Sequence, residues 1–213
     1  AAGLDTGAIR PGSTYNDPGV WKIDGANVVN VAEGKGSGPQ SVRSLLDLSL
    51  NTGATWILMQ LGGGKLNDAG RSKLFTYYTD HYRLGKATGI EQGYEGTGFV
   101  IGPENKDNGI NITYANMAFG QAFSATAVQM GSALSAIVNG GTYYRPHMVL
   151  PAAASDGTMP NNKLRDGVVS AQTSRDMRDL LEYVTESHAK SGFAYMDFGD
   201  RYNVGGKTGT AQI

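Results

Sequence analysis

Hydrophobic residues between positions 41 and 61 recur at helical spacing. The polar segment Ser49-Leu50-Asn51-Thr52-Gly53 lies in the middle of this stretch, and its Asn-Thr-Gly step is expected to divide the pattern into two helices. Gly62-Gly63-Gly64 then ends the pattern. The sequence therefore predicts two consecutive helices joined by a short polar break.

Three further helices are expected farther along the chain. The first starts near residue 74 and ends near Gly85, and the second spans about 125–139 before a Gly140-Gly141 stop. The third begins behind an N-cap at Ser170 and continues to about Glu186. Its core-facing positions are expected to be Met177, Leu180, Leu181 and Val184.

Turn residues and short apolar runs dominate the remaining segments. Residues 8–39 carry repeated Pro-Gly and Gly-rich steps, so little regular structure is expected there beyond a short extended piece at 28–31. Residues 85–111 and 151–165 are expected to be loops. Strands are expected at 142–150 and at 202–210. Helices with a few strands, and no visible boundary, predict a single α+β domain over residues 1–213.

Composition narrows the class of protein. The 213 residues are enough for a substantial core, and 40% hydrophobic with 17% charged residues is typical of a globular domain. A formal net charge of -1 gives no reason to expect nucleic acid as a partner. The absence of cysteine excludes disulfides and thiolate metal sites, and the three histidines have no metal-ligand spacing. No cofactor or metal is therefore expected.

Gly206-Lys207-Thr208 is open to two interpretations. As the end of a phosphate-binding loop it needs a glycine five residues before Gly206, where Arg201 stands, and a helix after Thr208, for which too few residues follow. The other interpretation is the Lys-Thr-Gly element of serine acyltransferases, which accompanies a Ser-x-x-Lys nucleophile and a second serine motif. The second interpretation fits the sequence better.

Ser49-Leu50-Asn51 matches the Ser-x-Asn element of such enzymes. By itself the pattern arises often by chance, and a helix-breaking cap is then the simpler interpretation. In an acyltransferase, a serine hydroxyl needs a neighbouring base, which a lysine of lowered pKa can supply. A strand lysine and hydroxyls then bind a substrate carboxylate, and a strand N–H helps to form an oxyanion hole.

Five blocks, in the order in which that family has them, resemble class B penicillin-binding proteins, the monofunctional D,D-transpeptidases of cell-wall synthesis. The blocks are Thr14-Tyr15-Asn16-Asp17-Pro18-Gly19, Ser49-Leu50-Asn51-Thr52-Gly53, Leu84-Gly85 with Thr88-Gly89-Ile90 and Glu95-Gly96, Phe119-Gly120-Gln121 with Asn139-Gly140-Gly141, and Gly206-Lys207-Thr208-Gly209-Thr210-Ala211-Gln212. The Ala-Gln after Thr210 points to class B. Ala122 and Ala127 depart from the family pattern, which usually has glycine and often proline there, and both residues are expected to fit a helix.

The resemblance implies the penicillin-binding, serine β-lactamase-like α+β fold, here incomplete. It implies a D,D-transpeptidase that cross-links peptidoglycan stem peptides ending in D-Ala-D-Ala and is blocked by β-lactams, with no cofactor. It gives Ser49 and Asn51 roles in proton relay and amide positioning. Lys207, counted with Ser49 and Asn51 as catalytic, would bind the substrate carboxylate together with Thr208 and Thr210, with the Thr210 N–H in the oxyanion hole and Gly209 in the same substrate-binding segment. The parent protein would be membrane-anchored, extracytoplasmic and associated with other cell-wall synthesis proteins.

The nucleophile is the largest departure from the family. No Ser-x-x-Lys precedes Ser49, so a truncated domain is expected, with its nucleophile upstream. The chain alone is then expected to form no acyl-enzyme. Its last strand is expected to be covered by a partner or by missing parts of the same domain. Ser187-His188-Ala189-Lys190 matches the pattern literally but lies between the other two motifs, in the wrong order. A β-lactamase or D,D-carboxypeptidase, and a non-catalytic structural fragment, remain as alternatives.

Overall fold

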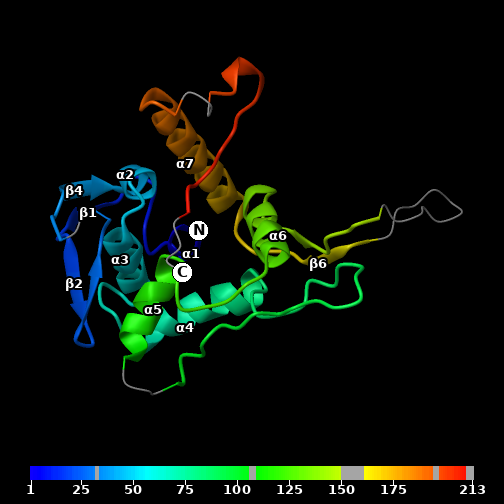
Figure 1. Cartoon of the computed structure of the whole chain (residues 1–213), viewed down its shortest axis with the longest axis horizontal. Helices are drawn as coiled ribbons and strands as arrows, with labels where there is room; N and C mark the ends of the chain where they lie inside the picture. The colour runs from blue at the N-terminus through cyan, green and yellow to red at the C-terminus, as the bar shows by residue number, and fades with distance from the viewer. Residues whose placement is uncertain (32–33, 106–108, 150–160, 194–196, 210–213) are drawn as a thin grey trace, which may run out of the picture.

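Short helices form the centre of the molecule, and small sheets lie at its edges (Figure 1). The computed structural model describes residues 1–31, 34–105, 109–149, 161–193 and 197–209. The helices are α1 Ala2–Asp5, α2 Val42–Asp47, α3 Asn51–Leu61, α4 Asp68–Thr76, the π-helix η1 Tyr77–His81, α5 Ile110–Ala118, α6 Ala127–Val138, α7 Ala171–Lys190 and the 3-10 helix η3 Gly199–Arg201. With the strands below, they confirm an α+β architecture.

Four short strands lie within the first 41 residues and form two antiparallel pairs. Strand β1 (Thr14–Asp17) pairs with β4 (Gly38–Ser41), and β2 (Val20–Ile23) pairs with β3 (Ala26–Val29). The expectation of little regular structure in this segment was wrong. Asp24 and Gly25, with φ 47° and 80°, form the two-residue connection between β2 and β3, so the turn residues join strands instead of replacing them.

The expected break between two helices is present, but it lies three residues earlier than Asn51-Thr52-Gly53. Ser41 and Ser44 form a capping box at the start of α2, which ends at Asp47 with Leu48 as its C-cap. Ser49 then takes a left-handed conformation, with φ 53°, and α3 begins at Asn51. Gly53 lies inside α3. Glycine suits this position because a side chain there would clash with Leu45 and the Tyr15 hydroxyl. Gly62 ends α3, as predicted.

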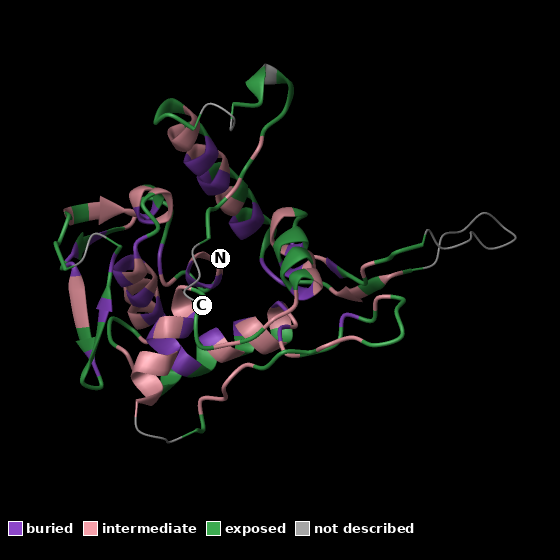
Figure 2. Cartoon of the chain, viewed as in Figure 1, coloured by how far each residue is buried: buried purple, intermediate pink, exposed green. Residues whose placement is uncertain are grey.

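The predictions of α6 and α7 are confirmed, with α7 extending four residues beyond Glu186. The helix expected from about residue 74 to Gly85 begins earlier, as α4 from Asp68, and ends earlier, with the π-helix η1 that stops at His81. Ser170 accepts the Thr173 N–H as the predicted N-cap. Figure 2 shows the buried residues along α7, where Leu180, Leu181 and Val184 face the core as expected and Met177 is half-buried. Helix α5 was missed, since its sequence follows a glycine-rich stretch that reads as loop.

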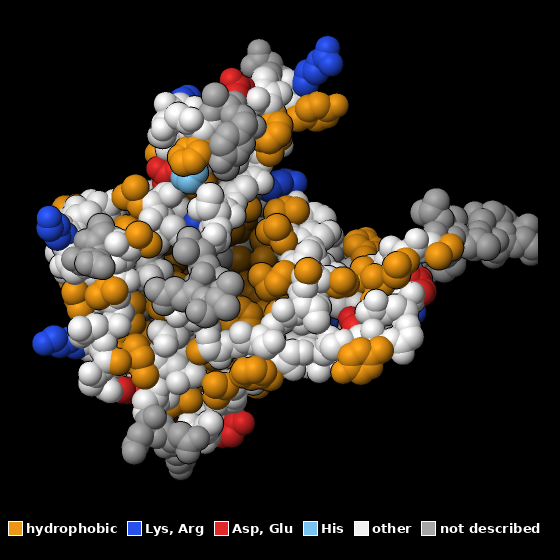
Figure 3. Space-filling view, in the orientation of Figure 1, with side chains coloured by type: hydrophobic (Ala, Val, Ile, Leu, Met, Phe, Trp, Pro, Cys, Tyr) orange, Lys and Arg blue, Asp and Glu red, His pale blue; other side chains and the backbone are white. Residues whose placement is uncertain are grey.

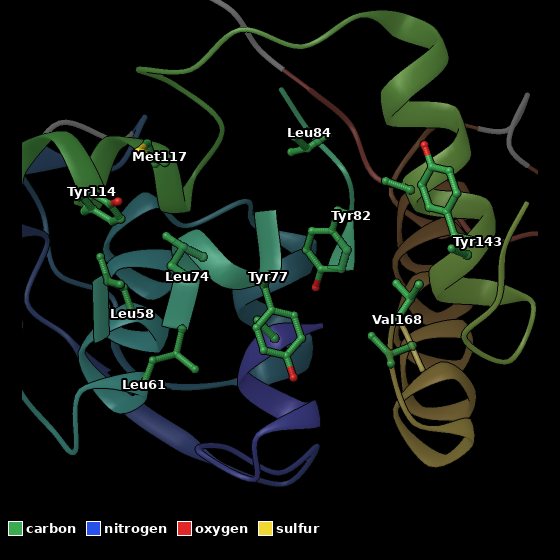
Figure 4. Close-up of a cluster of buried hydrophobic side chains, with 14 residues drawn as sticks. Leu58, Leu61, Leu74, Tyr77, Tyr82, Leu84, Tyr114, Met117, Tyr143 and Val168 are labelled. Carbon is green, nitrogen blue, oxygen red and sulfur yellow. The ribbon is translucent and has the colours of Figure 1, made fainter. Parts of the chain in front are cut away.

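The main core joins side chains from α3, α4, η1 and α5 to residues near α6 and α7. Tyr77 and Tyr82 lie between the cluster around Leu58 and the pair Tyr143 and Val168 (Figure 4). The Tyr78 hydroxyl donates to the Met117 carbonyl over 2.7 Å, so this aromatic group is anchored as well as buried. Figure 3 shows hydrophobic side chains gathered in a hollow beside α6 on one face of the molecule.

Two predictions for the second half of the chain need correction. Among the described residues, the strand expected at 142–150 is limited to β5 (Tyr143–Tyr144). Its partner, β6 (Lys163–Arg165), lies in a segment that was expected to be loop. Residues 150–160 lie outside the described part. Residues 202–209 contain no strand, because among the described residues no strand lies beside them, and they pack against α7 instead. Within the described residues, the helices include none that is both long and apolar enough to cross a bilayer.

Candidate active site

Ser49 lies at the turn between α2 and α3. The residue is exposed, and its left-handed φ of 53° is a conformation that L-residues adopt at a cost. Its N–H donates to the Leu46 carbonyl over 3.2 Å, which closes the end of α2. The serine of the Ser-x-Asn motif is therefore presented to solvent at a tight, strained turn.

Asn51 is the first residue of α3 and is half-buried. Its side-chain Nδ2 donates to the Val29 carbonyl, at the end of β3, over 2.9 Å. This hydrogen bond uses the nitrogen end of the amide and fixes the side-chain plane. The oxygen Oδ1 is the hydrogen-bond acceptor at the other end of the same amide.

A buried carboxylate, Asp17, lies behind the start of α3 and was not singled out from the sequence. Its Oδ1 accepts the Thr52 hydroxyl over 2.7 Å, and its Oδ2 accepts the Ser37 hydroxyl over 2.6 Å. Burial acts to raise the pKa of Asp17, but the hydrogen bonds from Ser37, Thr52 and Gly19 outweigh it and lower the pKa to about 2. Asp17 is therefore ionised at neutral pH.

Lys207, Thr208 and Gly209 lie exposed in the segment that follows η3. The Lys207 ammonium donates to the Thr208 carbonyl over 2.9 Å and lies 3.3 Å from the Thr208 hydroxyl. Desolvation lowers the pKa of Lys207, while the negative charge of Asp47 acts in the opposite direction. Thr210, the fourth substrate-binding residue expected from the sequence, lies outside the described residues.

Helix α7 connects the two motifs. The Gly206 N–H donates to the Leu181 carbonyl in the middle of α7 over 3.2 Å, and in Figure 1 the chain after η3 runs back beside this helix. Near the C-terminal end of α7, the Ser187 hydroxyl donates to Asp47 Oδ2 over 2.9 Å. Because Asp47 ends α2, two residues before Ser49, α7 contacts both the Lys-Thr-Gly segment and the helix that leads to the Ser-x-Asn turn.

The literal Ser-x-x-Lys match at the end of α7 has contacts unlike those of a serine and its lysine base. Ser187 donates to Asp47, as described above, and His188 Nε2 lies 3.4 Å from the other Asp47 oxygen. The Lys190 ammonium pairs with Glu186 at 3.6 Å. These contacts support a structural role for Ser187 in joining α7 to α2.

The sequence motifs give Ser49, Asn51 and the Lys-Thr-Gly segment as candidate site residues, but they do not point to the residues that hold the start of α3. Asp17 lay within a block that resembles the family, yet its partner Thr52 is 35 residues away in the chain. Spacing alone does not reveal such a contact. Within the described residues, no three His, Asp or Glu side chains cluster in a way that would hold a metal ion.

Comparison with known proteins identifies the family of the chain. The family model described as "Penicillin binding protein transpeptidase domain" matches residues 1–213. Stage V sporulation protein D of Bacillus subtilis (strain 168) is 34% identical over 202 residues, which cover 93% of this chain and 29% of that protein. Penicillin-binding protein PbpB of Mycobacterium tuberculosis is 28% identical over 217 residues, which cover 100% of this chain and 30% of that protein. The chain thus spans less than a third of the length of these relatives.

Solved structures give the same result. Penicillin-binding protein 3 of Mycobacterium tuberculosis, complexed with aztreonam, superposes with a TM-score of 0.73 at 26% identity, over 86% of this chain and 39% of that one. The D,D-transpeptidase domain of a peptidoglycan glycosyltransferase from Eggerthella lenta gives 0.78 at 20% identity, over 100% of this chain and 51% of that one, a likeness in fold. With the family model matched from the first residue to the last, the chain belongs to the penicillin-binding protein transpeptidase domain family.

Proposed function

We propose that residues 1–213 form the substrate-binding and proton-relay part of a peptidoglycan D,D-transpeptidase domain. One observation carries the proposal: α7 contacts both α2, which leads to the exposed Ser49 of the Ser-x-Asn turn, and the segment that carries Lys207-Thr208-Gly209, within a chain that matches the family throughout. The serine nucleophile would lie outside this sequence, since no Ser-x-x-Lys precedes Ser49.

In the proposed reaction, the nucleophilic serine oxygen attacks the carbonyl carbon of the penultimate D-alanine. The peptide C–N bond breaks, and the terminal D-alanine leaves with a proton relayed through Ser49. The amine of a neighbouring stem peptide then attacks the resulting ester, forms the cross-link and frees the serine. A β-lactam would acylate the same serine and leave it blocked.

The roles of the described residues follow from their contacts. The Asn51 Oδ1 would accept the N–H of the substrate backbone, because Nδ2 is already bonded to Val29. Lys207 and the Thr208 hydroxyl would bind the terminal carboxylate of the stem peptide. We assign Thr210 to the same carboxylate and to the oxyanion hole by its place in the motif. The parent protein would act on the outer side of the cytoplasmic membrane, anchored to it, with other cell-wall synthesis proteins.

The test is covalent labelling of the complete protein with a fluorescent penicillin, followed by a denaturing gel. We expect a labelled band, and we expect Asn51→Ala or Lys207→Ala to lower the labelling rate by about 100-fold or more. A complete protein that is never labelled, or one that hydrolyses penicillin rapidly with turnover, contradicts the proposal.

Ser187→Ala is the matched control for the nucleophile. The Ser187 hydroxyl is bonded to Asp47, so its loss removes a contact between α7 and α2 and is expected to slow labelling of the complete protein only modestly, whereas loss of the nucleophile would abolish it. Residues 1–213 alone are expected to give no covalent band. A band from those residues alone that disappears in Ser187→Ala would identify Ser187 as the nucleophile and refute our assignment.

A further inference from the structure

Asp17 is the centre of a buried hydrogen-bond network beneath the Ser-x-Asn turn. Its side chain is 2% exposed and accepts hydrogen bonds on both oxygens. Oδ1 accepts from the Gly19 N–H over 3.0 Å and from the Thr52 hydroxyl over 2.7 Å. Oδ2 accepts from the N–H and hydroxyl of Ser37 over 3.1 and 2.6 Å. Such a set of donors fits a carboxylate that stays charged.

Asn30 extends this network from Asp17 to the first turn of α3. The Asn30 Nδ2 donates to both Asp17 oxygens, over 3.2 and 3.1 Å. Its Oδ1 accepts the Thr52 N–H over 3.1 Å. N–H groups in the first turn of a helix have no helical carbonyl as partner, and the Thr52 N–H is one of them. Asn30, directly after β3, therefore caps the start of α3. The ionised Asp17 behind it also suits the positive end of the α3 dipole.

Thr52 is held at every polar atom. Besides the bonds to Asp17 and Asn30, its carbonyl accepts the Trp21 Nε1–H over 3.0 Å. The residue is fully buried. The neighbouring Asn51 is bonded to Val29, directly before Asn30, so consecutive residues at the end of β3 hold consecutive residues at the start of α3. The orientation of the Asn51 amide therefore depends on the Asp17–Asn30–Thr52 network.

We propose that Asp17 is a positioning residue for the transpeptidase reaction, acting through Asn30 and Thr52 to aim the Asn51 amide oxygen at the substrate. The inference rests on the proposed function, since only there does Asn51 touch substrate. Asp17 itself touches no substrate. A displacement of about 1 Å in a substrate-binding group can cost about 100-fold in rate, which is the scale of effect that the network would prevent.

The experiment compares variants of the complete protein by the rate of acylation as a function of fluorescent penicillin concentration. This separates the maximal acylation rate constant from the apparent affinity. In Asp17→Asn and Thr52→Val, we expect the maximal rate constant to fall about 10- to 100-fold, with the apparent affinity changing much less. Thr52→Ser keeps the hydroxyl donor and is expected to retain a rate constant close to that of the unmodified protein.

Asp24→Asn is the matched control. Asp24 lies at the other end of the β2–β3 hairpin, where its carboxylate accepts the N–H groups of Asn111 and Ile112 over 2.8 and 3.1 Å at the start of α5. The variant loses a hydrogen-bonded carboxylate from the β2–β3 hairpin, whereas Asp17 belongs to β1, and it does not touch the Ser-x-Asn turn. We expect it to lower thermal stability and to leave the acylation rate constant unchanged.

A second readout is amide hydrogen exchange of the segment 45–53 in the same proteins. Exchange is expected to be faster in Asp17→Asn and Thr52→Val and unchanged in Asp24→Asn. Thr52→Val with an unaltered rate constant, or equal losses of rate in Asp17→Asn and Asp24→Asn, would overturn the inference. If the unmodified protein is not labelled, the proposed function fails; unchanged exchange in Asp17→Asn then refutes the positioning role separately.

Discussion

Ala122 departs from the family pattern, and its backbone conformation is unfavourable for alanine. The sequence suggested that Ala122 fits a helix, but it lies in a bend between α5 and α6 with φ 58°. In this left-handed region a Cβ atom crowds the backbone, whereas glycine has no Cβ. The glycine that the family usually has at this position therefore suits the backbone better than alanine.

We predict that Ala122→Gly stabilises the protein by about 1 kcal/mol, because relief of the left-handed strain exceeds the added flexibility of the unfolded chain. Urea or thermal unfolding of the complete protein measures the change. Ala189→Gly, inside α7, is the control with the opposite sign and should destabilise by about 0.5–1 kcal/mol. Destabilisation by Ala122→Gly would show that the strain is absent.

At the level of elements, helix α6 begins with a complete cap. Thr126 accepts the Gln129 N–H over 3.1 Å, and Gln129 Oε1 accepts the Thr126 N–H over 2.8 Å. The buried Gln129 also donates to the carbonyls of Lys86 and Thr97, over 2.7 and 2.8 Å, and so fixes the preceding loop. Ala127 is the first helical residue, as its expected fit to a helix requires.

We predict that Ala127→Pro stabilises the protein by about 0.4–1 kcal/mol. The first helical position needs no N–H donor, and Thr126, with φ -80° and ψ 156°, already has the extended backbone that a following proline requires. Thermal unfolding gives the sign. Ala136→Pro, in the last turn of the same helix and beyond its first turn, should cost about 3 kcal/mol or more. A loss of stability in Ala127→Pro would mean that the cap is distorted by the ring.

The elements that were predictable are those that their own residues specify. The pair α2 and α3, and the helices α6 and α7, follow from local apolar spacing and caps. The strands before α2 were missed because each is four residues long and is defined by its partner; β1 and β4 are separated by 20 residues of chain. Helix α5 was missed because its apolar residues follow directly on glycine-rich sequence.

The candidate site divides in the same way. Motif order pointed to Ser49, Asn51 and Lys207, whose types and spacing carry their chemistry. Asp17 and Asn30, which hold the start of α3 beside Asn51, were not predictable, because their hydrogen bonds with Thr52 span 35 and 22 residues of chain. The residue type alone does not show whether a carboxylate is buried or exposed.

At the scale of the whole molecule, three aspartates join segments that are far apart in the chain. Asp5 accepts the Ser170 N–H over 2.7 Å and the Tyr77 hydroxyl over 2.5 Å. Asp17 joins β1 to α3, and Asp24 joins the β2–β3 hairpin to α5. In each case burial raises the pKa but hydrogen bonds outweigh it, so that the pKa of all three carboxyls is lowered.

Acid is therefore expected to loosen the fold through these carboxylates. A carboxyl whose pKa is lower in the folded than in the unfolded protein contributes stability above the unfolded value, about 3.9, and this stability is lost as the pH falls through the folded value. For Asp17, with a folded pKa of about 2, the contribution at pH 7 is roughly 2 kcal/mol. We predict a thermal midpoint that is nearly constant from about pH 7 to 5 and falls steeply from about pH 4 to 2.

The Asp17→Asn variant tests whether ionised Asp17 contributes to this pH dependence. The variant cannot be stabilised by ionisation at position 17, so its midpoint should be well below that of the unmodified protein at pH 7, and the difference should shrink as the pH approaches about 2. Differential scanning calorimetry across this pH range measures both midpoints. A difference that stays constant with pH would mean that Asp17 acts through its shape and hydrogen-bonding pattern, whereas a shrinking difference identifies its charge as the stabilising feature beneath the Ser-x-Asn turn.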